Sequence, residues 1–366
     1  MMLGPPLKFV ERNYVIYEDK KLLYFGGIDY HRLSNHPEVL HIVSMAASEY
    51  GLNPTGSRTT TGNHPLYLQL EKKISEFFQS EGAVVFASGY LANMILLQAV
   101  AEKFDIFFLD KISHSSIVDA VRQFDKKTVY FKHLDTHSLE MQLKKHMKKI
   151  LRALIVTDGV FAARGEIPPL DEYLQVMNNY SAKLLVDDAH AMAVVGATGK
   201  GSWEVCGIDR SRVYQTGTLS KGFGIAGGII PAETEVVEAI RQKSMAFVGS
   251  TGLALPLAAA AIYSIDYLLS KRDLITSLQE RSIDLKNRMR KLGFDIPLSP
   301  APIVSITFYD EAKNKRLFRR LIEKGIYPPF INYPGAPPGG HFRFAISSHH
   351  SEADIERLYE AVESSV

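Results

Sequence analysis

The chain has 366 residues, of which 46% are hydrophobic and 22% are charged, a composition typical of a soluble globular protein with one large and one small domain. Its formal net charge of +2 argues against a protein that binds nucleic acid or an anionic membrane surface. Cys206 is the only cysteine, so no disulfide can form within the chain, which fits a reducing cytoplasm.

The opening residues and the apolar stretches give no sign of targeting to a membrane. Prolines at positions 5 and 6 interrupt the start of the chain, where a secretory signal would be apolar. The longest apolar stretches, such as 253–265, are too short to span a bilayer. We therefore expect a cytoplasmic protein without a membrane span. The basic cluster at 144–149 is interpreted as the solvated last turn of a helix, where cations suit the dipole.

Between residues 64 and 230, apolar strand-like runs alternate with amphipathic helix-like runs. Leu66, Leu70, Ile74 and Phe77, for example, recur with the spacing of one helix face. The sequence predicts strands at 83–87, 106–109, 128–131, 151–156, 183–186 and 212–215, and helices at 66–78, 90–101, 115–124, 138–149 and 171–179. Strands separated by helices favour βαβ units and a mostly parallel sheet.

The two ends of the chain follow other patterns. The first 45 residues contain a hairpin pattern, with strands at 14–17 and 22–25, and a long helical stretch covers 254–292. The remainder predicts a smaller α+β part, with strands at 303–308 and 342–346, helices at 315–324 and from 351, and a Pro/Gly-rich loop between 328 and 340. We therefore expect an N-terminal segment (1–45), a large α/β domain (46–265) and a C-terminal α+β domain (266–366).

An acid and a lysine each follow a predicted strand. Asp187, with Asp188 and His190 after it, ends one apolar run, and Lys221 lies in a loop of small residues after the next. Open α/β sheets bind ligands at the carboxyl ends of their strands. Pyridoxal 5'-phosphate (PLP) needs a lysine that forms a Schiff base and an acid that keeps its pyridine nitrogen protonated. We predict Lys221 and Asp187 for these two roles, and a structural role for Asp188.

Two other predicted strand ends carry candidate site residues. Ser88, Gly89 and Tyr90 join a strand to a helix, where backbone N–H groups can bind phosphate and Gly89 allows close approach. A plain turn is the alternative there. His114 could stack on an aromatic ring or move a proton, or it could simply cap a helix.

Several motifs are set aside. Gly222 to Gly227 matches the dinucleotide pattern G-x-G-x-x-G, but neither an amphipathic helix nor a downstream acid accompanies it. Gly196 to Ser202 has the wrong spacing for a phosphate loop. The histidines lack acidic or sulfur neighbours at ligand spacing, so the sequence predicts no metal site.

Together the motifs resemble those of the α-oxoamine synthases, PLP-dependent enzymes of the aspartate aminotransferase fold (type I), which include 8-amino-7-oxononanoate synthase and serine palmitoyltransferase. The likeness runs from about residue 14 to residue 360. It is carried by Gly56-Ser57-Arg58, Gly62-Asn63-His64-Pro65, Ser88-Gly89-Tyr90-Leu91-Ala92-Asn93, Asp158-Gly159-Val160-Phe161, Val186-Asp187-Asp188-Ala189-His190, Thr218 with Lys221-Gly222-Phe223-Gly224, and Phe342-Arg343-Phe344.

The resemblance implies a role for each matching residue. Lys221 would bind PLP covalently, Asp187 would hold the ring nitrogen, His114 would stack on the ring and His190 would lie near the phenolic oxygen. The residues at the phosphate end would be Ser88, Gly89, Tyr90 and Thr218, with Ser250 or Thr251 contributed by the partner subunit of a homodimer. Arg343 would bind the carboxylate of the amino-acid substrate with its planar fork.

The reaction implied by the resemblance is a decarboxylative condensation of a small amino acid with an acyl thioester of coenzyme A (CoA) or acyl carrier protein. Activity like that of 8-amino-7-oxononanoate synthase is the first expectation. A less polar acyl chain, as for serine palmitoyltransferase, or glycine acetyl transfer is the alternative within the family. An aminotransferase or lyase of the same fold, and a non-catalytic PLP-binding dimer, are the alternatives outside it.

Three positions depart from the family pattern. Ile28 and Ala162 stand where the family usually has asparagine and serine, and Tyr333 stands where a late arginine is common. These changes make the expected pocket less polar and less cationic, which favours a less polar acyl chain.

Overall fold

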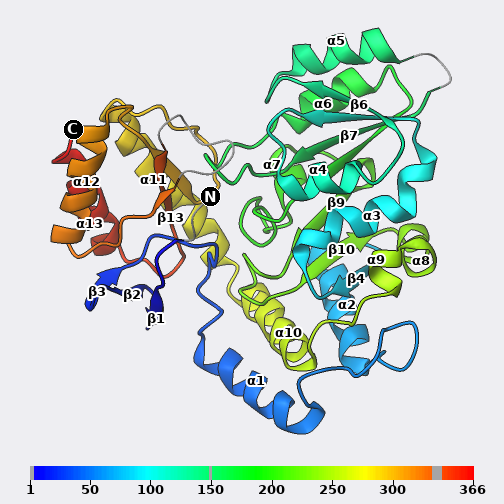
Figure 1. Ribbon diagram of the computed structural model, residues 1–366, viewed down its shortest axis with the longest axis horizontal. Coiled ribbons are helices and arrows are strands. Elements are labelled where there is room, and N and C mark those ends of the chain that lie inside the picture. The colour runs from blue at the N-terminus through cyan, green and yellow to red at the C-terminus, as the bar shows by residue number, and fades with distance from the viewer. Residues whose placement is uncertain (1–3, 148–150, 332–339) are drawn as a thin grey trace.

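The computed structural model describes residues 4–147, 151–331 and 340–366, which form a large sheet domain, a smaller C-terminal domain and N-terminal strands beside the latter (Figure 1). The strands are β1 (Lys8–Val10), β2 (Tyr14–Tyr17), β3 (Lys20–Leu23), β4 (Gly82–Phe86), β5 (Ile106–Asp110), β6 (Lys127–Phe131), β7 (Ala153–Asp158), β8 (Ala182–Asp187), β9 (Val213–Thr218), β10 (Gly228–Ala232), β11 (Ile303–Ile306), β12 (Phe330–Ile331) and β13 (His341–Ala345). The α-helices are α1 (Pro37–Tyr50), α2 (Pro65–Phe78), α3 (Ala92–Val100), α4 (Ser115–Val121), α5 (Thr136–His146), α6 (Leu170–Met177), α7 (Ser202–Val205), α8 (Thr234–Lys243), α9 (Met245–Val248), α10 (Leu255–Ser270), α11 (Asp273–Lys291), α12 (Glu311–Glu323) and α13 (Glu352–Glu363), and Gly89–Leu91, Ala101–Lys103 and Arg210–Arg212 form single 3-10 turns.

The large sheet has seven strands in the order β4-β10-β9-β8-β7-β5-β6. Strands β9, β8, β7, β5 and β6 are parallel, and β10 runs antiparallel to both β4 and β9. Both faces of the sheet are buried: along β7, Leu154 and Val156 join one core while Ala153 and Ile155 join another. Such continuous apolar strands are typical of parallel sheets covered on both sides. The predicted α/β class with a mostly parallel sheet is therefore confirmed.

Helices cover the two faces of this sheet. Helices α3, α4, α8 and α9 pack on one face. Helices α2 and α10 cover the β4–β10 part of the other face, and α5 and α6 cover the part formed by β5, β7 and β8. This arrangement leaves the carboxyl ends of β5, β7, β8 and β9 at one edge of the sheet, where loops carry the predicted site residues.

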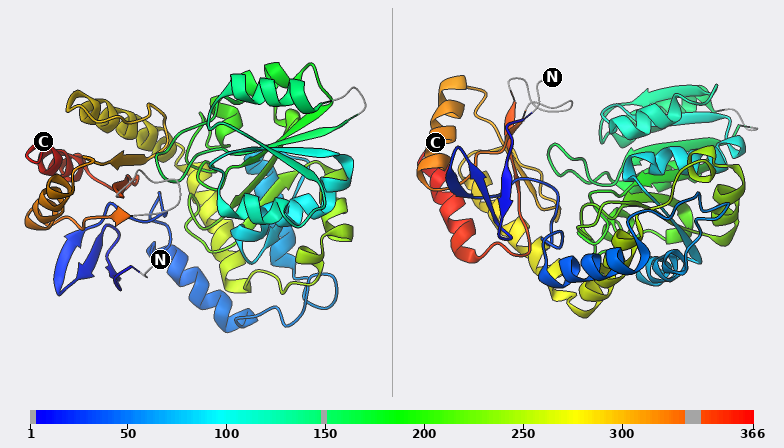
Figure 2. Two further views of the ribbon diagram at one scale, coloured as in Figure 1. Left: turned by 45° about the horizontal axis from the view of Figure 1, so that its top comes forward. Right: turned by 60° about the horizontal axis from the view of Figure 1, so that its bottom comes forward.

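The C-terminal domain has a three-stranded antiparallel sheet, β11-β13-β12, packed against α11, α12 and α13. The N-terminal strands lie against this domain, as Figures 1 and 2 show. Backbone hydrogen bonds join them: Leu23 N donates to Gly325 O at 2.8 Å, and Ala345 N donates to Phe25 O at 2.6 Å. The boundary expected at 265/266 falls inside α10.

Some elements of the fold were not predicted from the sequence. Helices α1 and α8 and strand β10 are among them, and residues 254–292 were expected to form one helical stretch, whereas the chain leaves helical geometry at Lys271 between α10 and α11. Helix α1 lacks a clear apolar periodicity because only Val39 and Ala46 are buried on it. Lys148, Lys149 and Tyr333, which carried earlier expectations, lie outside the described residues.

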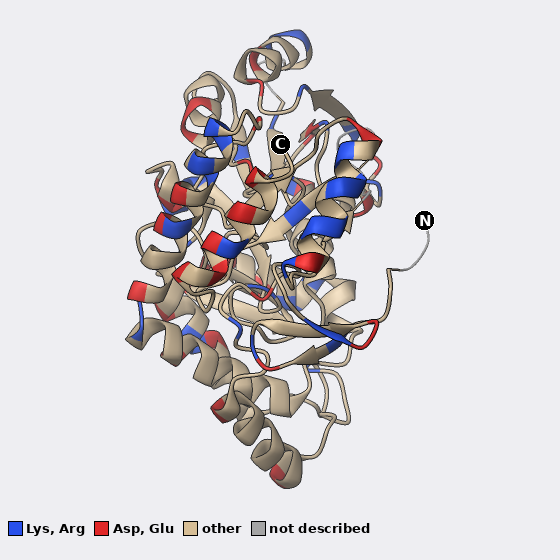
Figure 3. Ribbon diagram, turned by 90° about the vertical axis from the view of Figure 1, so that its left-hand side faces the viewer, with Lys and Arg blue, Asp and Glu red and all other residues tan. Residues whose placement is uncertain are grey.

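Charges of both signs alternate on the outer helices of the C-terminal domain (Figure 3). They form ion pairs such as Lys324–Glu360 (2.9 Å) and Arg288–Glu356 (2.8 Å). Within the described ranges no helix is long and apolar enough to cross a membrane. Nor do three or more His, Cys, Asp or Glu side chains of those ranges gather in a way that could hold a metal ion.

Candidate active site

A cavity of about 300 Å³ lies at the carboxyl ends of β8 and β9. Asp187 is the last residue of β8, and Lys221 lies in the loop that leaves β9. Of the residues predicted for the site, those that line this one cavity are Ile28, Ser88, Gly89, Tyr90, His114, Asp187, His190, Thr218 and Lys221. The fold therefore brings together residues that are up to 193 positions apart in the sequence, from Ile28 to Lys221.

The carboxylate of Asp187 is fixed by a set of hydrogen bonds. Asn93 Nδ2 donates to Oδ2 at 2.6 Å and the backbone N–H of Ala189 donates to Oδ1 at 3.0 Å. Ser116 Oγ makes a longer contact of 3.4 Å to Oδ2. Asp187 is 7% exposed, so these donors replace water and hold the carboxylate in one orientation.

The amine of Lys221 is prepared to act as a base or nucleophile. Burial lowers its pKa to about 8, against the opposing effect of the Asp187 carboxylate, and Arg343 lowers the pKa further. A lysine with such a pKa is neutral in about one molecule in ten at pH 7, far more often than an ordinary lysine, and the neutral amine is the reactive form.

His190 and Arg343 meet through the hydroxyl group of Tyr30. Tyr30 Oη lies 2.8 Å from His190 Nδ1, and one terminal nitrogen of Arg343 lies 3.5 Å from the same hydroxyl. Burial, with the positive charges of Lys221 and Arg343, lowers the pKa of His190 well below its usual value. His190 is therefore neutral near pH 7.

Arg343 is held by backbone carbonyls and not by an acid. Its Nε donates to the carbonyl of Ala162 at 2.5 Å, and a terminal nitrogen donates to the carbonyl of Gly27 at 3.2 Å. None of the carboxylates in the described part of the chain forms an ion pair with it. Arg343 is not part of the cavity lining itself, but it leaves a positive charge beside it that no acid of the described residues neutralises.

His114 has two functions in the structure. It lines the cavity, and its Nδ1 also accepts from the backbone N–H of Ser116 at 3.2 Å, which caps α4. The helix-capping interpretation of this histidine is confirmed, and stacking on an aromatic ring or moving a proton stays a prediction. Its ring lies edge-on to Tyr90, with ring centroids 6.1 Å apart.

The opposite end of the cavity is formed by the start of the 3-10 turn before α3 and by the loop after β9. A Cβ atom on Gly89 would lie 2.5 Å from Thr218 Oγ1, so only glycine fits there. Thr218 Oγ1 donates to the carbonyl of Gly227 at 2.6 Å and contacts Ser220 Oγ at 3.0 Å. This end of the cavity is polar, and the missing side chain at Gly89 lets a ligand approach the backbone. An anionic group can therefore bind there.

Ser250 and Thr251 lie elsewhere in the same protomer. Ser250 Oγ donates to the carbonyl of Ala246 at 2.5 Å, and Thr251 forms a β-bridge with Ser57. Neither lines the cavity of its own chain. Their contribution from a partner subunit therefore stays a prediction.

Sequence reasoning assigned no role to Asp158 or Asn93, which the structure places at the site. Asp158 ends β7, is in register with Asp187, and accepts from the backbone N–H of His114 at 3.0 Å. Burial, and then the neighbouring Asp187 charge, raise the pKa of Asp158 well above its usual value. The rule that found Asp187, an acid at the end of an apolar strand, would also have found Asp158.

Asp188, by contrast, turns away from the cavity. Its carboxylate accepts from Ser202 Oγ at 2.6 Å and from Gln215 Nε2 at 2.7 Å, and it is fully buried. Burial raises its pKa to about 7. These contacts agree with a structural role for Asp188.

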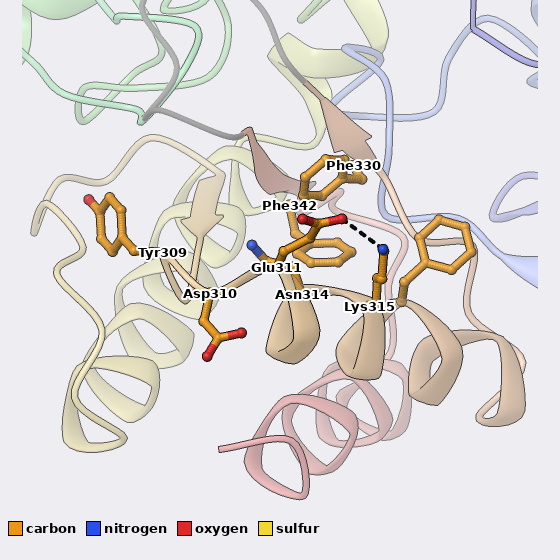
Figure 4. A pocket seen from close by; sticks show the side chains of 8 residues that line it. Tyr309, Asp310, Glu311, Asn314, Lys315, Phe330 and Phe342 are labelled. Atoms are coloured by element: carbon orange, nitrogen blue, oxygen red, sulfur yellow. Dashed lines mark ion pairs between the residues drawn. The ribbon is translucent and has the colours of Figure 1, made fainter.

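A larger cavity, of about 460 Å³, lies in the C-terminal domain between α12 and the β12–β13 pair (Figure 4). Its charged residues already have partners within α12: Lys315 pairs with Glu311 at 2.7 Å, and Asp310 caps the first turn. It contains neither Lys221 nor Asp187. We therefore assign the chemistry to the smaller cavity, because only that one combines a lysine of low pKa with a fixed carboxylate.

The fold and this cavity define a transferase of the type I PLP-dependent class. Residues 20–362 match the family model of aminotransferase class I and II. The chain is 33% identical over 349 residues to 8-amino-7-oxononanoate synthase of Thermoanaerobacter pseudethanolicus, covering 95% of this chain and 88% of the relative. It is 34% identical over 348 residues to 8-amino-7-oxononanoate synthase 1 of Bacillus velezensis, covering 94% and 88%.

A solved structure of serine palmitoyltransferase from S. paucimobilis, with bound PLP, superposes with a TM-score of 0.90 at 25% identity, covering 98% of this chain and 90% of that chain. The chain belongs to the aminotransferase class I and II family and, within it, to the α-oxoamine synthases, which are PLP-dependent acyltransferases. The resemblance drawn from the sequence motifs is thereby confirmed.

PLP is the cofactor of this family, and the cavity fits it. The fit rests on three features: a buried amine with a pKa of about 8, a carboxylate fixed by Asn93, and a polar end where Gly89 contacts Thr218 too closely for any side chain. The carboxylate lies where the ring nitrogen would be, and the polar end at Gly89 and Thr218 lies where the phosphate would be.

Proposed function

We propose that this protein joins the α-carbon of a small amino acid to the carbonyl carbon of an acyl thioester, releasing the thiol and CO₂ and forming an α-amino ketone. An activity like that of 8-amino-7-oxononanoate synthase is the first candidate, since curated relatives of that name are about one-third identical over most of the chain. PLP, when bound, supplies an electron sink for negative charge on the α-carbon of the amino acid.

Each residue of the cavity has a role of its own in this proposal. Lys221 would hold the cofactor and, with its pKa of about 8, take the α-proton at Nζ. Asp187 would keep the ring nitrogen charged, and His114 would lie against the ring. His190 would donate to the phenolic oxygen of PLP, and Tyr30 would orient the His190 ring through its hydrogen bond to Nδ1. Ser88, Gly89, Tyr90 and Thr218 would hold the phosphate.

The observation that carries this proposal is the convergence of Lys221, Asp187 and an arginine without an acidic partner. The guanidinium group of Arg343 would bind a substrate carboxylate through two parallel hydrogen bonds. No acid of the described residues competes for it. An α-amino acid presents a carboxylate and an amine close together, and these groups match Arg343 and the Lys221 end of the cavity.

A less polar acyl group, as in the serine palmitoyltransferases, is the second candidate. Ile28 lines the cavity and is 39% exposed, so it adds apolar surface where the family usually has an amide. The fold similarity to serine palmitoyltransferase also supports this candidate.

We also place a homodimer with shared active sites within this proposal. Exposed apolar side chains lie on and just after α1: Leu40, Met45 and Leu52 are 52%, 59% and 75% exposed. Apolar surface of this kind is typical of a protein interface. Ser250 and Thr251 would then reach the partner's cavity. A cytoplasmic location is part of the same proposal and agrees with the single free cysteine.

The test begins with the visible absorbance spectrum of the PLP-loaded protein during separate titrations with alanine, glycine and serine. The amino acid that shifts the spectrum is then incubated with acyl-CoA thioesters while thiol and CO₂ release are measured. Equal release of both supports the proposal. Amino-group transfer to a keto acid without thiol release would identify an aminotransferase, and a spectrum that no amino acid changes would identify a non-catalytic PLP-binding protein.

A further inference from the structure

A second cavity, of about 240 Å³, adjoins the first one. The two cavities share His114 and Asp158 in their walls. A group that enters the second cavity therefore passes directly beside the residues that face Lys221. The proposed reaction has two substrates, and only one of them, the amino acid, is accounted for by Lys221 and Arg343.

The walls of the second cavity are largely apolar. Ile112, Phe161, Ala162 and Ala163 supply carbon surface, and Phe161 is 3% exposed. The ring of His133 packs edge-on against Phe161, with centroids 4.4 Å apart, which fixes this wall. Such a surface favours an aliphatic ligand, because each methylene moved out of water gains free energy.

The lining also contains Asp158, which lies where the two cavities meet and accepts from the backbone N–H of His114, and the charged residues Lys111 and Glu166. Glu166 is paired with Arg164 at 3.2 Å and lies 3.4 Å from His133, so its charge is balanced within the protein. Lys111 is exposed at the rim, where its amine stays hydrated.

The loop that forms the apolar wall is tied to the amino-acid end of the site. The carbonyl of Ala162 accepts from Arg343 Nε at 2.5 Å. The loop is closed on itself, since Phe161 N donates to Glu166 O at 2.9 Å and Gly165 N donates to Phe161 O at 2.8 Å. The second cavity therefore begins beside the residue proposed to hold the substrate carboxylate.

We propose that the second cavity binds the acyl chain of the thioester, and that Ile112 and Ala163 limit the length of that chain. This inference rests on the proposed function. A cavity of about 240 Å³ is below the range of about 300–1,000 Å³ typical of sites for drug-sized ligands. It therefore selects a chain of short to medium length over a long fatty acyl chain.

The test compares acetyl-CoA, octanoyl-CoA and palmitoyl-CoA as substrates of the PLP-loaded protein. Ala163→Leu narrows the cavity, and we expect the ratio of kcat/KM for octanoyl-CoA to that for acetyl-CoA to fall by about tenfold or more, since one methylene group in a substrate pocket changes selectivity by about 10- to 200-fold. Ile112→Ala widens the cavity and should raise the palmitoyl-to-octanoyl ratio. Ala312→Leu, on exposed α12, is the matched control and should leave both ratios unchanged.

The outcomes separate this inference from the proposed function. If the wild-type protein releases thiol from acyl-CoA but neither variant alters chain-length preference, the acyl chain binds elsewhere and the inference fails alone. A change in preference among amino acids, with constant acyl preference, would assign the cavity to the amino-acid side chain and also overturn it. If no thioester reacts with any amino acid, both proposals fail. Ile112 is 39% exposed, so its truncation keeps the test available if Ala163→Leu does not fold.

Discussion

The side-chain amide of Asn93 donates a hydrogen bond of 2.6 Å to the carboxylate of Asp187, and its own carbonyl oxygen accepts one of 2.8 Å from Thr216. All three side chains are buried. Asn93 belongs to α3, Asp187 to β8 and Thr216 to β9. One oxygen of the carboxylate is therefore oriented by the packing of a helix on two strands, while the other accepts from the N–H of Ala189 in the loop that follows β8.

We expect Asn93→Ala to weaken PLP binding by about tenfold or more, because a hydrogen bond to a charged group contributes about 1.5–3 kcal/mol. The measurement is a PLP titration of the apoprotein, followed by absorbance. Asn178→Ala removes an amide that bonds Arg212 at the surface (2.9 Å) and should leave the affinity unchanged. Wild-type affinity in Asn93→Ala would show that Asp187 needs no such support.

The sequence could predict Asp187 and Lys221 because each follows a buried strand, and strand ends share one edge of a parallel sheet. Asp158 obeys the same rule at the end of β7. Asn93 could not be found this way, because it lies inside α3, and the motif that contains it assigns it no role. Its role depends on the position of α3 over β8 and β9, which only the folded chain specifies.

The helices and strands also differ in how well the sequence predicts them. Strands such as β7 and β8 were predictable because both of their faces are apolar. Helix α1 was not, because Leu40 and Met45 point to solvent in the single chain and blur its periodicity. Strand β10 was missed because its five residues follow a glycine-rich loop, and its antiparallel direction breaks the βαβ alternation.

Lys221 should react as a lysine of low pKa in the apoprotein. Its pKa of about 8 lies below the ordinary 10.5, so the rate of labelling by acetic anhydride should rise with pH, reach half of its maximum near pH 8 and level off about one pH unit higher. Mass spectrometry of the labelled peptide gives this rate. Between pH 8 and 10.5 the unfolded chain binds more protons at this lysine than the folded one, so its contribution to stability should rise with pH over that window.

Lys221→Ala is the control for this measurement, and it also tests the mechanism. We expect it to lose the reactive label and all turnover while its far-ultraviolet circular dichroism stays that of the wild type. A reactive lysine elsewhere with the same pH profile would contradict the assignment. Full turnover in Lys221→Ala would remove this residue from the mechanism.

Arg343→Ala should weaken amino-acid binding far more than PLP binding. Loss of one partner of a charge-assisted bidentate pair costs about 1.5–3 kcal/mol, which corresponds to about a 10- to 150-fold rise in the apparent Kd of the amino acid. Absorbance titrations with PLP and with the amino acid give the two constants. Arg288→Ala, which removes an exposed ion pair with Glu356, is the matched control. Equal weakening of both ligands would mean that Arg343 supports the whole cavity and does not bind the substrate carboxylate.

Leu52→Glu should separate the proposed dimer and reduce turnover with it. Leu52 is 75% exposed in the single chain, and a charge buried there without a partner would weaken self-association by at least about tenfold. Light scattering after size-exclusion chromatography gives the mass, and thiol release gives the activity. Leu298→Glu alters another exposed leucine, 55% exposed in the C-terminal domain, and should leave both unchanged. Because Ser250 and Thr251 do not reach their own cavity, turnover should fall in step with the dimer fraction as the protein is diluted. A Leu52→Glu monomer with full activity would show that one chain builds a complete site.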